Sequence, residues 1–340
     1  MTLFEDVLGQ QKATGLLSRA LEGNRLAHAY LFSGPEGVGK RMTAARFAGA
    51  LLCDADENKT KPCGRCRSCI QFAAGSSPDF LRIVPQGATI RIDQVRELKK
   101  SLGYPPLESP RRVVLLEDAH TMRREAANSL LKLLEEPPPD NILLLTALDS
   151  EPLLPTILSR CQVIPFYPLD PDAAARIIAG HDPSLTGEKA ARLARLTGGC
   201  PGLARDFEAA ELLPVYDEVI DALVDRYEGE AARVERALAV AGHTAELKDN
   251  LEALLDLLRF FFRDCMLAML RDGAGKEEIT SDHRAHRARE LWNLEQVSDK
   301  VQVIDFVTKA LARNCNRLMA CEVLMLSLLC EDKNDALRLS

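Results

Sequence analysis

The sequence lacks the features that would place the chain in or across a membrane. No uninterrupted apolar run approaches the roughly 20 residues that a helix needs to span a bilayer, because charged residues interrupt even the most apolar segment, 254–270. The first eleven residues show no basic leader followed by an apolar core, so we expect no signal peptide. We therefore expect a cytoplasmic protein that has no membrane partner.

The sequence also lacks an excess of positive charge and is poor in aromatic residues. Lys and Arg number 43 against 50 Asp and Glu, which gives a formal net charge of −7, and aromatic residues make up 5% of the chain. Proteins that coat nucleic acid use a basic surface and aromatic side chains on which bases stack. We therefore expect any DNA contact to come from a local basic patch or from partner subunits.

Ten cysteines are present, but their uneven spacing argues against a disulfide framework in this chain. Four of them, Cys53, Cys63, Cys66 and Cys69, form a C-x9-C-x2-C-x2-C pattern. This pattern predicts a structural zinc site in which protein thiolates fill all four tetrahedral positions. An iron–sulfur cluster and unligated core thiols are the alternatives. The other six cysteines lie among apolar residues, and we expect them to be buried thiols.

Short apolar segments alternate with amphipathic helical segments as far as about residue 166. The predicted strands are 29–33, 79–84, 112–116 and 142–146, and the predicted helices are 12–22, 40–52, 93–102 and 124–135. This alternation predicts an α/β domain, in which helices cover both faces of a parallel sheet. Beyond residue 167 the sequence has almost no strand pattern and predicts helices, with a break at 272–275.

The length of 340 residues suggests two or three domains. We expect an α/β domain over residues 1–166, with the cysteine-rich knuckle inserted at 53–69. A small helical domain over 167–208 and an all-helical domain over 209–340 would follow it.

Residues 34–40 (GPEGVGK) lie between a predicted strand and a predicted helix, which is the context of a phosphate-binding P-loop. Gly34, Gly37 and Gly39 would let backbone amides turn inward around a phosphate, and the helix N-terminus would add its dipole. Lys40 would meet the terminal phosphates. The motif therefore predicts a protein related to nucleotide-binding proteins.

Two features of this predicted nucleotide site depart from what ATP hydrolysis needs. Arg41 stands where a P-loop carries the Ser or Thr that ligates magnesium, and a guanidinium has no lone pair and repels the metal. After strand 112–116 come Glu117 and Asp118, where an active ATPase usually carries Asp-Glu. A group misplaced by about 1 Å can cost on the order of 100-fold in rate. We therefore expect no intrinsic ATPase activity and at most weak ATP binding. The alternative is that Glu117 and Asp118 merely end a strand.

Several motifs resemble those of the AAA+ clamp-loader subunits of bacterial DNA polymerase III. They follow one another in order along residues 3–205. They are the box 4–10 (FEDVLGQ), the strand 28–35, the knuckle after the P-loop helix, the segments 92–96 and 128–138, and the Ser-Arg-Cys motif at 159–161. The resemblance implies an AAA+ domain, a helical lid over 167–208 and a C-terminal collar over 209–340 through which subunits associate. The collar fits the family only by its length and helicity.

The resemblance also implies roles for single residues. Motor subunits of the family (gamma/tau type) keep an intact Gly-Lys-Thr/Ser and Asp-Glu, so Arg41 and Glu117 favour the non-hydrolysing branch. Motor subunits place an arginine where this chain has Gly202, and the role of Arg205 stays open. Arg160 is implied to be an arginine finger that acts in trans at a neighbouring subunit's ATP and magnesium site, where such a group is worth about 10³ to 10⁵ in rate. The alternative is that Arg160 caps the preceding helix.

These residues are compatible with three candidate functions. The first is a non-hydrolysing clamp-loader subunit of the DNA polymerase (nucleotidyltransferase) holoenzyme, in a hetero-oligomer with gamma/tau motors and a clamp-opening delta subunit. Its further partners would be the sliding clamp and, through the assembled complex, primed DNA. The second is an ATP-hydrolysing motor of such a loader, which Arg41, Glu117 and Gly202 disfavour. The third is a zinc-dependent nucleic-acid-binding protein, but Phe72 is the one aromatic residue near the cysteines.

Overall fold

The protein is described by a computed structural model. Its described residues are 3–23, 25–55, 61–87, 89–148, 153–183, 185–205, 209–270, 284–288, 290–313 and 315–330. The chain forms two compact units, Met1–Ala173 and Ala174–Ser340. No helix in the described part is both long enough and apolar enough to cross a bilayer. The finer division at residues 166 and 208 stays a prediction.

The first unit is built on one parallel sheet of five strands. These are β1 (Ala29–Ser33), β2 (Phe80–Ile83), β3 (Arg112–Leu116), β4 (Asn141–Ala147) and β5 (Gln162–Pro165), in the order β2-β3-β4-β1-β5. The four strands predicted from the sequence are confirmed. Strand β5 was not predicted from the sequence, because it is only four residues long and its first two residues are exposed.

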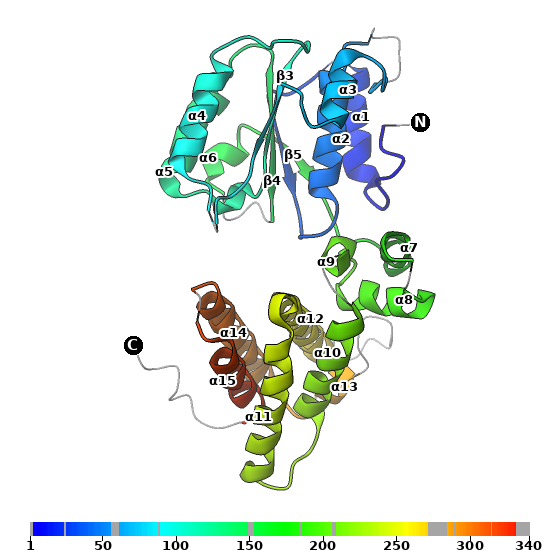
Figure 1. Ribbon diagram of the computed structural model, residues 1–340, viewed down its shortest axis with the longest axis vertical. Helices are drawn as coiled ribbons and strands as arrows, with labels where there is room; N and C mark the ends of the chain where they lie inside the picture. The colour runs from blue at the N-terminus through cyan, green and yellow to red at the C-terminus, as the bar shows by residue number, and fades with distance from the viewer. Residues whose placement is uncertain are drawn as a thin grey trace. The chain divides into compact units, whose positions relative to one another are not determined.

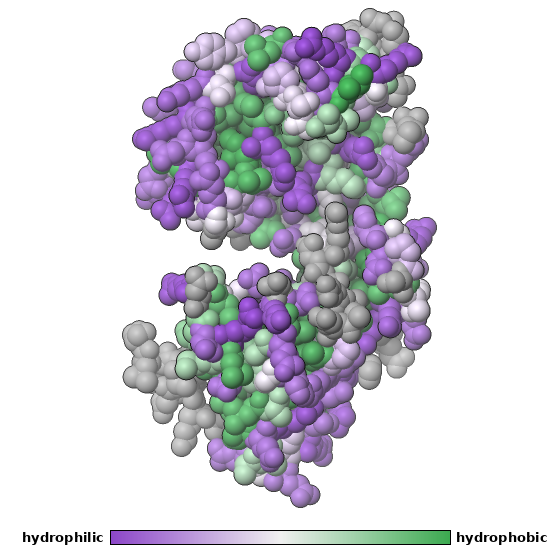
Figure 2. Space-filling model, viewed as in Figure 1, coloured by the Kyte–Doolittle hydropathy of each residue, from purple (hydrophilic) through white to green (hydrophobic). Residues whose placement is uncertain are grey.

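Helices cover both faces of this sheet, as predicted (Figure 1). Helices α4 (Ile92–Leu102), α5 (Arg124–Glu135) and α6 (Pro155–Leu158) lie on one face, and α1 (Gln11–Glu22), α2 (Lys40–Leu52) and α3 (Arg67–Ala73) lie on the other. Every residue of β3 and β4 is buried, because these strands have neighbours on both sides and helices above and below. The helices bury apolar side chains against the sheet, and polar residues cover much of the surface that Figure 2 shows.

The second unit is helical throughout its described residues. After α7 (Pro171–His181), which crosses the boundary between the units, its helices are α8 (Gly187–Leu196), α9 (Pro201–Arg205), α10 (Ala209–Val224), α11 (Glu230–Glu246), α12 (Leu251–Leu270), α13 (Arg284–Ala288), α14 (Leu294–Leu311) and α15 (Arg317–Leu329). Helix α11 packs on α15, and α14 packs on both α12 and α15. Phe261 and Phe262 are fully buried in its core. The predicted break at 272–275 lies outside the described residues.

A buried ion pair fixes the loop between α4 and β3. The Asp79 carboxylate, just before β2, accepts backbone N–H groups at 2.8 Å from residues 107–109. Arg112 lies 3.4 Å from Asp79 and donates to three carbonyls of the segment 101–105. Burial would raise the pKa of Asp79, but the three N–H donors and the Arg112 guanidinium outweigh it and hold that pKa below its usual value.

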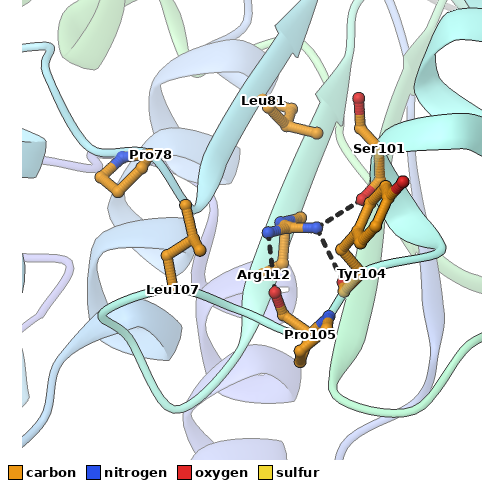
Figure 3. Close-up of a pocket in the computed structure, with 7 residues that line it drawn as sticks. All are labelled: Pro78, Leu81, Ser101, Tyr104, Pro105, Leu107 and Arg112. Carbon is orange, nitrogen blue, oxygen red and sulfur yellow. Dashed lines mark hydrogen bonds between the residues drawn. The ribbon is translucent and has the colours of Figure 1, made fainter.

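The same loop walls an open cavity of about 420 Å³. Its lining residues are Pro78, Leu81, Ser101, Tyr104, Pro105, Leu107 and Arg112. In Figure 3 the Arg112 guanidinium points to the carbonyls of this loop. The cavity lies at the start of β3, whereas the predicted nucleotide-binding residues follow the ends of β1 and β3, so it is a separate feature from the P-loop.

The network at Asp79 predicts a stability change with a defined pH dependence. Asp79→Asn removes the charge that pairs with Arg112, and at neutral pH we expect a loss of about 3 kcal/mol in the free energy of unfolding. Because the folded pKa is lowered, the native advantage exists above the unfolded pKa of about 4 and disappears as the pH falls through the folded pKa. Urea unfolding across pH, followed by circular dichroism, measures this difference.

The matched control is Asp93→Asn, since the Asp93 side chain is 84% exposed and its contact with Arg96 is 3.6 Å long. Amides 107–109 should lose hydrogen-exchange protection in Asp79→Asn alone. Equal stability of the two variants at neutral pH would contradict the assigned role of Asp79.

Candidate nucleotide site and metal centre

The P-loop joins β1 to α2, and its turns require glycine. Gly37 and Gly39 have φ angles of 72° and 96°, in the left-handed region that other residues rarely adopt. Gly39 is also the N-cap of α2, which begins at Lys40. A Cβ at Gly34 would lie 2.4 Å from the carbonyl oxygen of Phe166, just after β5. The loop therefore has the turns that its motif predicts, and its role in nucleotide binding stays a prediction.

The polar side chains that open α2 are engaged with the backbone. The Lys40 ammonium donates to the carbonyl of Gly34 at 2.7 Å and to that of Pro35 at 2.5 Å, and the residue is only 7% exposed. The Thr43 hydroxyl donates to the carbonyl of Gly39 at 2.9 Å. Because that hydroxyl serves the helix itself, Thr43 does not replace the metal ligand that is missing at Arg41.

The carboxylate of Glu117, at the end of β3, is paired with two arginines. Arg82, in β2, donates from Nε to Oε1 at 2.5 Å and from Nη2 to Oε2 at 3.2 Å. Arg41, in the first turn of α2, places Nη1 3.5 Å from Oε2. The hydrogen bond to Glu117 raises the pKa of Arg82. The carboxylate that a metal ion would need is therefore held by guanidinium groups from two neighbouring elements.

The turn after Glu117 is fixed by contacts with β4 and its end. Asp118 has a φ of 52°, a conformation that Asp tolerates better than most residues. Its N–H donates to the Thr146 hydroxyl at 3.0 Å, and its carbonyl accepts from the Thr121 hydroxyl at 2.7 Å. His120 accepts the N–H of Leu148 at Nδ1, and burial lowers the pKa of this histidine. The structure therefore brings Glu117 and Asp118 to the same sheet edge as the P-loop.

Arg160 lies at the opposite edge of the sheet. It precedes β5, whereas the P-loop follows β1 and Glu117 follows β3, and parallel strands all end at the same edge. The Arg160 side chain is 34% exposed, with Nη2 2.9 Å from Oε1 of Glu135 and Nη1 3.0 Å from the carbonyl of Thr156 in α6. The contact with Thr156 is of the helix-capping kind, and the role of Arg160 in trans stays a prediction.

The four predicted cysteine ligands converge on one point. Their Sγ atoms all lie within 4.8 Å of one another. Cys53 directly follows α2, Cys63 and Cys66 lie in the following loop, and Cys69 lies in α3. The Cys66 sulfur also caps α3, because it accepts the N–H of Cys69. A tetrahedral ion with bonds of about 2.3 Å would place sulfurs about 3.8 Å apart, so the cluster fits such an ion.

Without a metal ion, the cysteines of the cluster differ in how readily they lose a proton. Backbone N–H groups of Arg65 and Cys66 lower the pKa of the Cys63 thiol to about 6. Burial raises the pKa of the Cys69 thiol to about 12 and raises that of Cys53. A divalent cation would hold all four as thiolates, and filled protein ligation would make the site structural.

The knuckle is packed onto the sheet domain by Phe72 of α3. A Cβ at Gly49 of α2 would lie 3.0 Å from the Phe72 ring, so the two helices approach closely there. Phe72 also packs edge-to-face on Phe80 of β2, with 4.9 Å between ring centroids. Arg67 of α3 lies 2.6 Å from Glu108 of the loop before β3.

The prediction that the other cysteines are buried is wrong for one of them. Cys200, Cys265 and Cys321 are buried, and Cys161 and Cys330 are half-buried. Cys315 is exposed, because it lies in the connection between α14 and α15 rather than on an apolar helix face.

The sequence did not predict a role at the site for Arg82, Thr146 or Glu135. Arg82 is a charged residue inside an otherwise apolar strand, and that is the one hint in the sequence that it faces a polar partner. Its contact with Glu117 depends on the pairing of β2 with β3, which spacing alone does not give. The side chain of Arg205 lies outside the described residues, although its backbone ends α9.

Comparisons with known proteins all point to one family. The protein-family profile described as "DNA polymerase III, delta subunit" matches residues 9–170. The DNA polymerase III subunit delta′ of Pseudomonas aeruginosa is 38% identical over 261 residues, which cover 72% of this chain and 72% of that protein. The subunit delta′ of Bacillus subtilis is 39% identical over 164 residues, or 48% of this chain and 49% of that protein.

The similarity extends to the other subunit type. The DNA polymerase III subunit gamma/tau of Mycobacterium tuberculosis is 31% identical over 320 residues, which cover 91% of this chain and 53% of that protein. The chain thus spans about half the length of the Bacillus and Mycobacterium relatives.

The geometry of the cysteine cluster predicts metal content. We expect the reduced, purified chain to carry about one zinc ion, and Cys63→Ser to lose it, because a structural site needs all four thiolates. Since the ligands must be deprotonated, zinc should be released as the pH falls. Elemental analysis measures the metal.

The control is Cys315→Ser, because Cys315 is exposed and lies outside the cysteine cluster, and this variant should keep the zinc. Bound iron with visible absorption would instead support an iron–sulfur cluster. A native chain without any metal would contradict the predicted metal site.

Proposed function

The chain belongs to the family of DNA polymerase III clamp-loader subunits, and from this premise we propose that it is the delta-prime-type, non-hydrolysing subunit of such a loader. In this role it works in a cytoplasmic hetero-oligomer with gamma/tau-type motors and a delta-type clamp-opening subunit. The complex places a sliding clamp on primed DNA. The observation that carries the proposal is the pairing of Glu117 with Arg82 and Arg41.

This pairing opposes ATP hydrolysis for a physical reason. A P-loop ATPase holds magnesium with a hydroxyl of the loop and an acidic side chain, and the metal neutralises charge as the phosphoryl group leaves. Here the loop offers Arg41 in place of the hydroxyl, and the acidic side chain is bound by Arg82. Two fixed cations in the metal's surroundings repel Mg²⁺ and offer it no lone pair.

The position of Arg160 supports a role at a partner's site. Within its own unit the residue lies at the sheet edge opposite the P-loop, so it is not placed to serve its own nucleotide. Its side chain is one-third exposed, and its guanidinium is oriented by Glu135. We infer that it completes the ATP site of a neighbouring motor subunit, where a fixed cation stabilises the charge on the transferring phosphoryl group.

A motor role is the second candidate, because the similarity to gamma/tau extends over 91% of this chain. It requires that Arg41 and Arg82 leave Glu117 free for magnesium. ATP turnover by the isolated chain separates the two candidates, since the delta-prime role predicts none. The proposed zinc in the knuckle is structural in both.

The role of Arg160 is tested in a reconstituted loader with clamp and primed DNA. The motor subunits should carry a substitution of their own Ser-Arg-Cys arginine, so that the site beside this chain is the one site with a complete set of groups. We expect Arg160→Ala to lower ATP turnover at that site by on the order of 10³-fold. Pre-steady-state phosphate release measures the rate.

Two further variants, one control and one of graded effect, complete this test. Arg96→Ala removes an exposed arginine of α4 and should leave turnover unchanged. Glu135→Gln weakens the orientation of Arg160 and should have an intermediate effect. Turnover by the isolated native chain, together with full activity of Arg160→Ala in the mixture, would favour the motor role.

A further inference from the structure

We propose that Arg82 is the residue that keeps this nucleotide site free of metal, because its guanidinium, with that of Arg41, substitutes for the divalent cation on Glu117. The inference rests on the proposed non-hydrolysing role and names the side chain that enforces it. Arg82 lies outside the P-loop and the acidic motif, in the neighbouring strand β2.

The geometry makes Arg82 the principal partner of Glu117. Its contact is bidentate, with Nε and Nη2 each donating to one carboxylate oxygen, which is the arrangement that binds carboxylates best. Both arginine side chains are more than half exposed, 52% for Arg82 and 65% for Arg41, but Arg41 makes only a single contact, at 3.5 Å, so its pairing with Glu117 is the weaker one. Replacing Arg41 alone therefore leaves the carboxylate occupied.

The burial of Glu117 explains why some cation must be present. Its side chain is 6% exposed, and a carboxylate at that depth is strongly unfavourable unless it is paired. When both arginines are removed, a cation from solution can supply the compensating charge. A site that rejects Mg²⁺ in the native chain should then bind it, at the position that Glu117 and the start of α2 define.

The test uses the full chain and compares four forms: native, Arg41→Thr, Arg41→Thr with Arg82→Ala, and the latter pair with Glu117→Gln. Thermal midpoints are measured with and without Mg²⁺, alone and with ATP. We expect no Mg²⁺ effect in the native chain or in Arg41→Thr. In the Arg41→Thr and Arg82→Ala pair, Mg²⁺ should raise the midpoint by on the order of a few degrees, with a logarithmic dependence on its concentration.

The Glu117→Gln form is the internal control and should lose that dependence, because the neutral amide no longer attracts the metal. If the pair of substitutions prevents folding, Arg82→Gln replaces Arg82→Ala, since its amide can still donate one hydrogen bond to Glu117. A Mg²⁺ shift in Arg41→Thr as large as in the pair, or no shift in a folded pair, overturns the inference.

This readout is independent of the assembled loader. Failure of the proposed function would appear as ATP turnover by the native chain or as an inert Arg160. Failure of this inference would appear only in the Mg²⁺ dependence of the variants, so the two outcomes are distinguishable.

Discussion

The buried carboxylate of Glu117 requires a cationic partner, and the choice of partner determines how the rest of the site behaves. In an ATPase the partner is magnesium, which arrives with nucleotide and leaves with it. Here Arg82 and Arg41 belong to the chain, so the charge at the end of β3 is balanced whether or not nucleotide is present. The charge balance around this carboxylate therefore does not depend on a bound ligand.

Helix α2 is tied to strand β2 at both of its ends. At its start, Arg41 and Arg82 meet on Glu117. At its far end, Cys53 enters the cysteine cluster, and Phe72 of the knuckle packs on both α2 and Phe80 of β2. β2 is an edge strand with one neighbour in the sheet, so these ties fix an element that the sheet alone would hold weakly. The knuckle thus stabilises the same strand that supplies Arg82.

Local patterns in the sequence were sufficient for the elements that apolar runs and motifs define. The central strands β3 and β4, the P-loop turns at Gly37 and Gly39 and the convergence of four cysteines all follow from short-range patterns. β5 was missed because it is short and half exposed, so burial leaves no periodic trace in it. Arg82 was missed for a different reason: its partner lies 35 residues along the chain, and the contact exists only because β2 and β3 pair. Charge pairing across strands is a property of the fold, not of spacing.

The parallel sheet also separates two tasks within one unit. All strands end at the edge that carries the P-loop and Glu117, so the site that would receive a phosphate is built there. Arg160 precedes β5 and lies at the edge where strands begin, held by Glu135 at the end of α5. A change that disables one edge therefore leaves the other intact. Such a chain can lose its own metal site to Arg41 and Arg82 and still present a cation to a neighbour, which is what the delta-prime role requires.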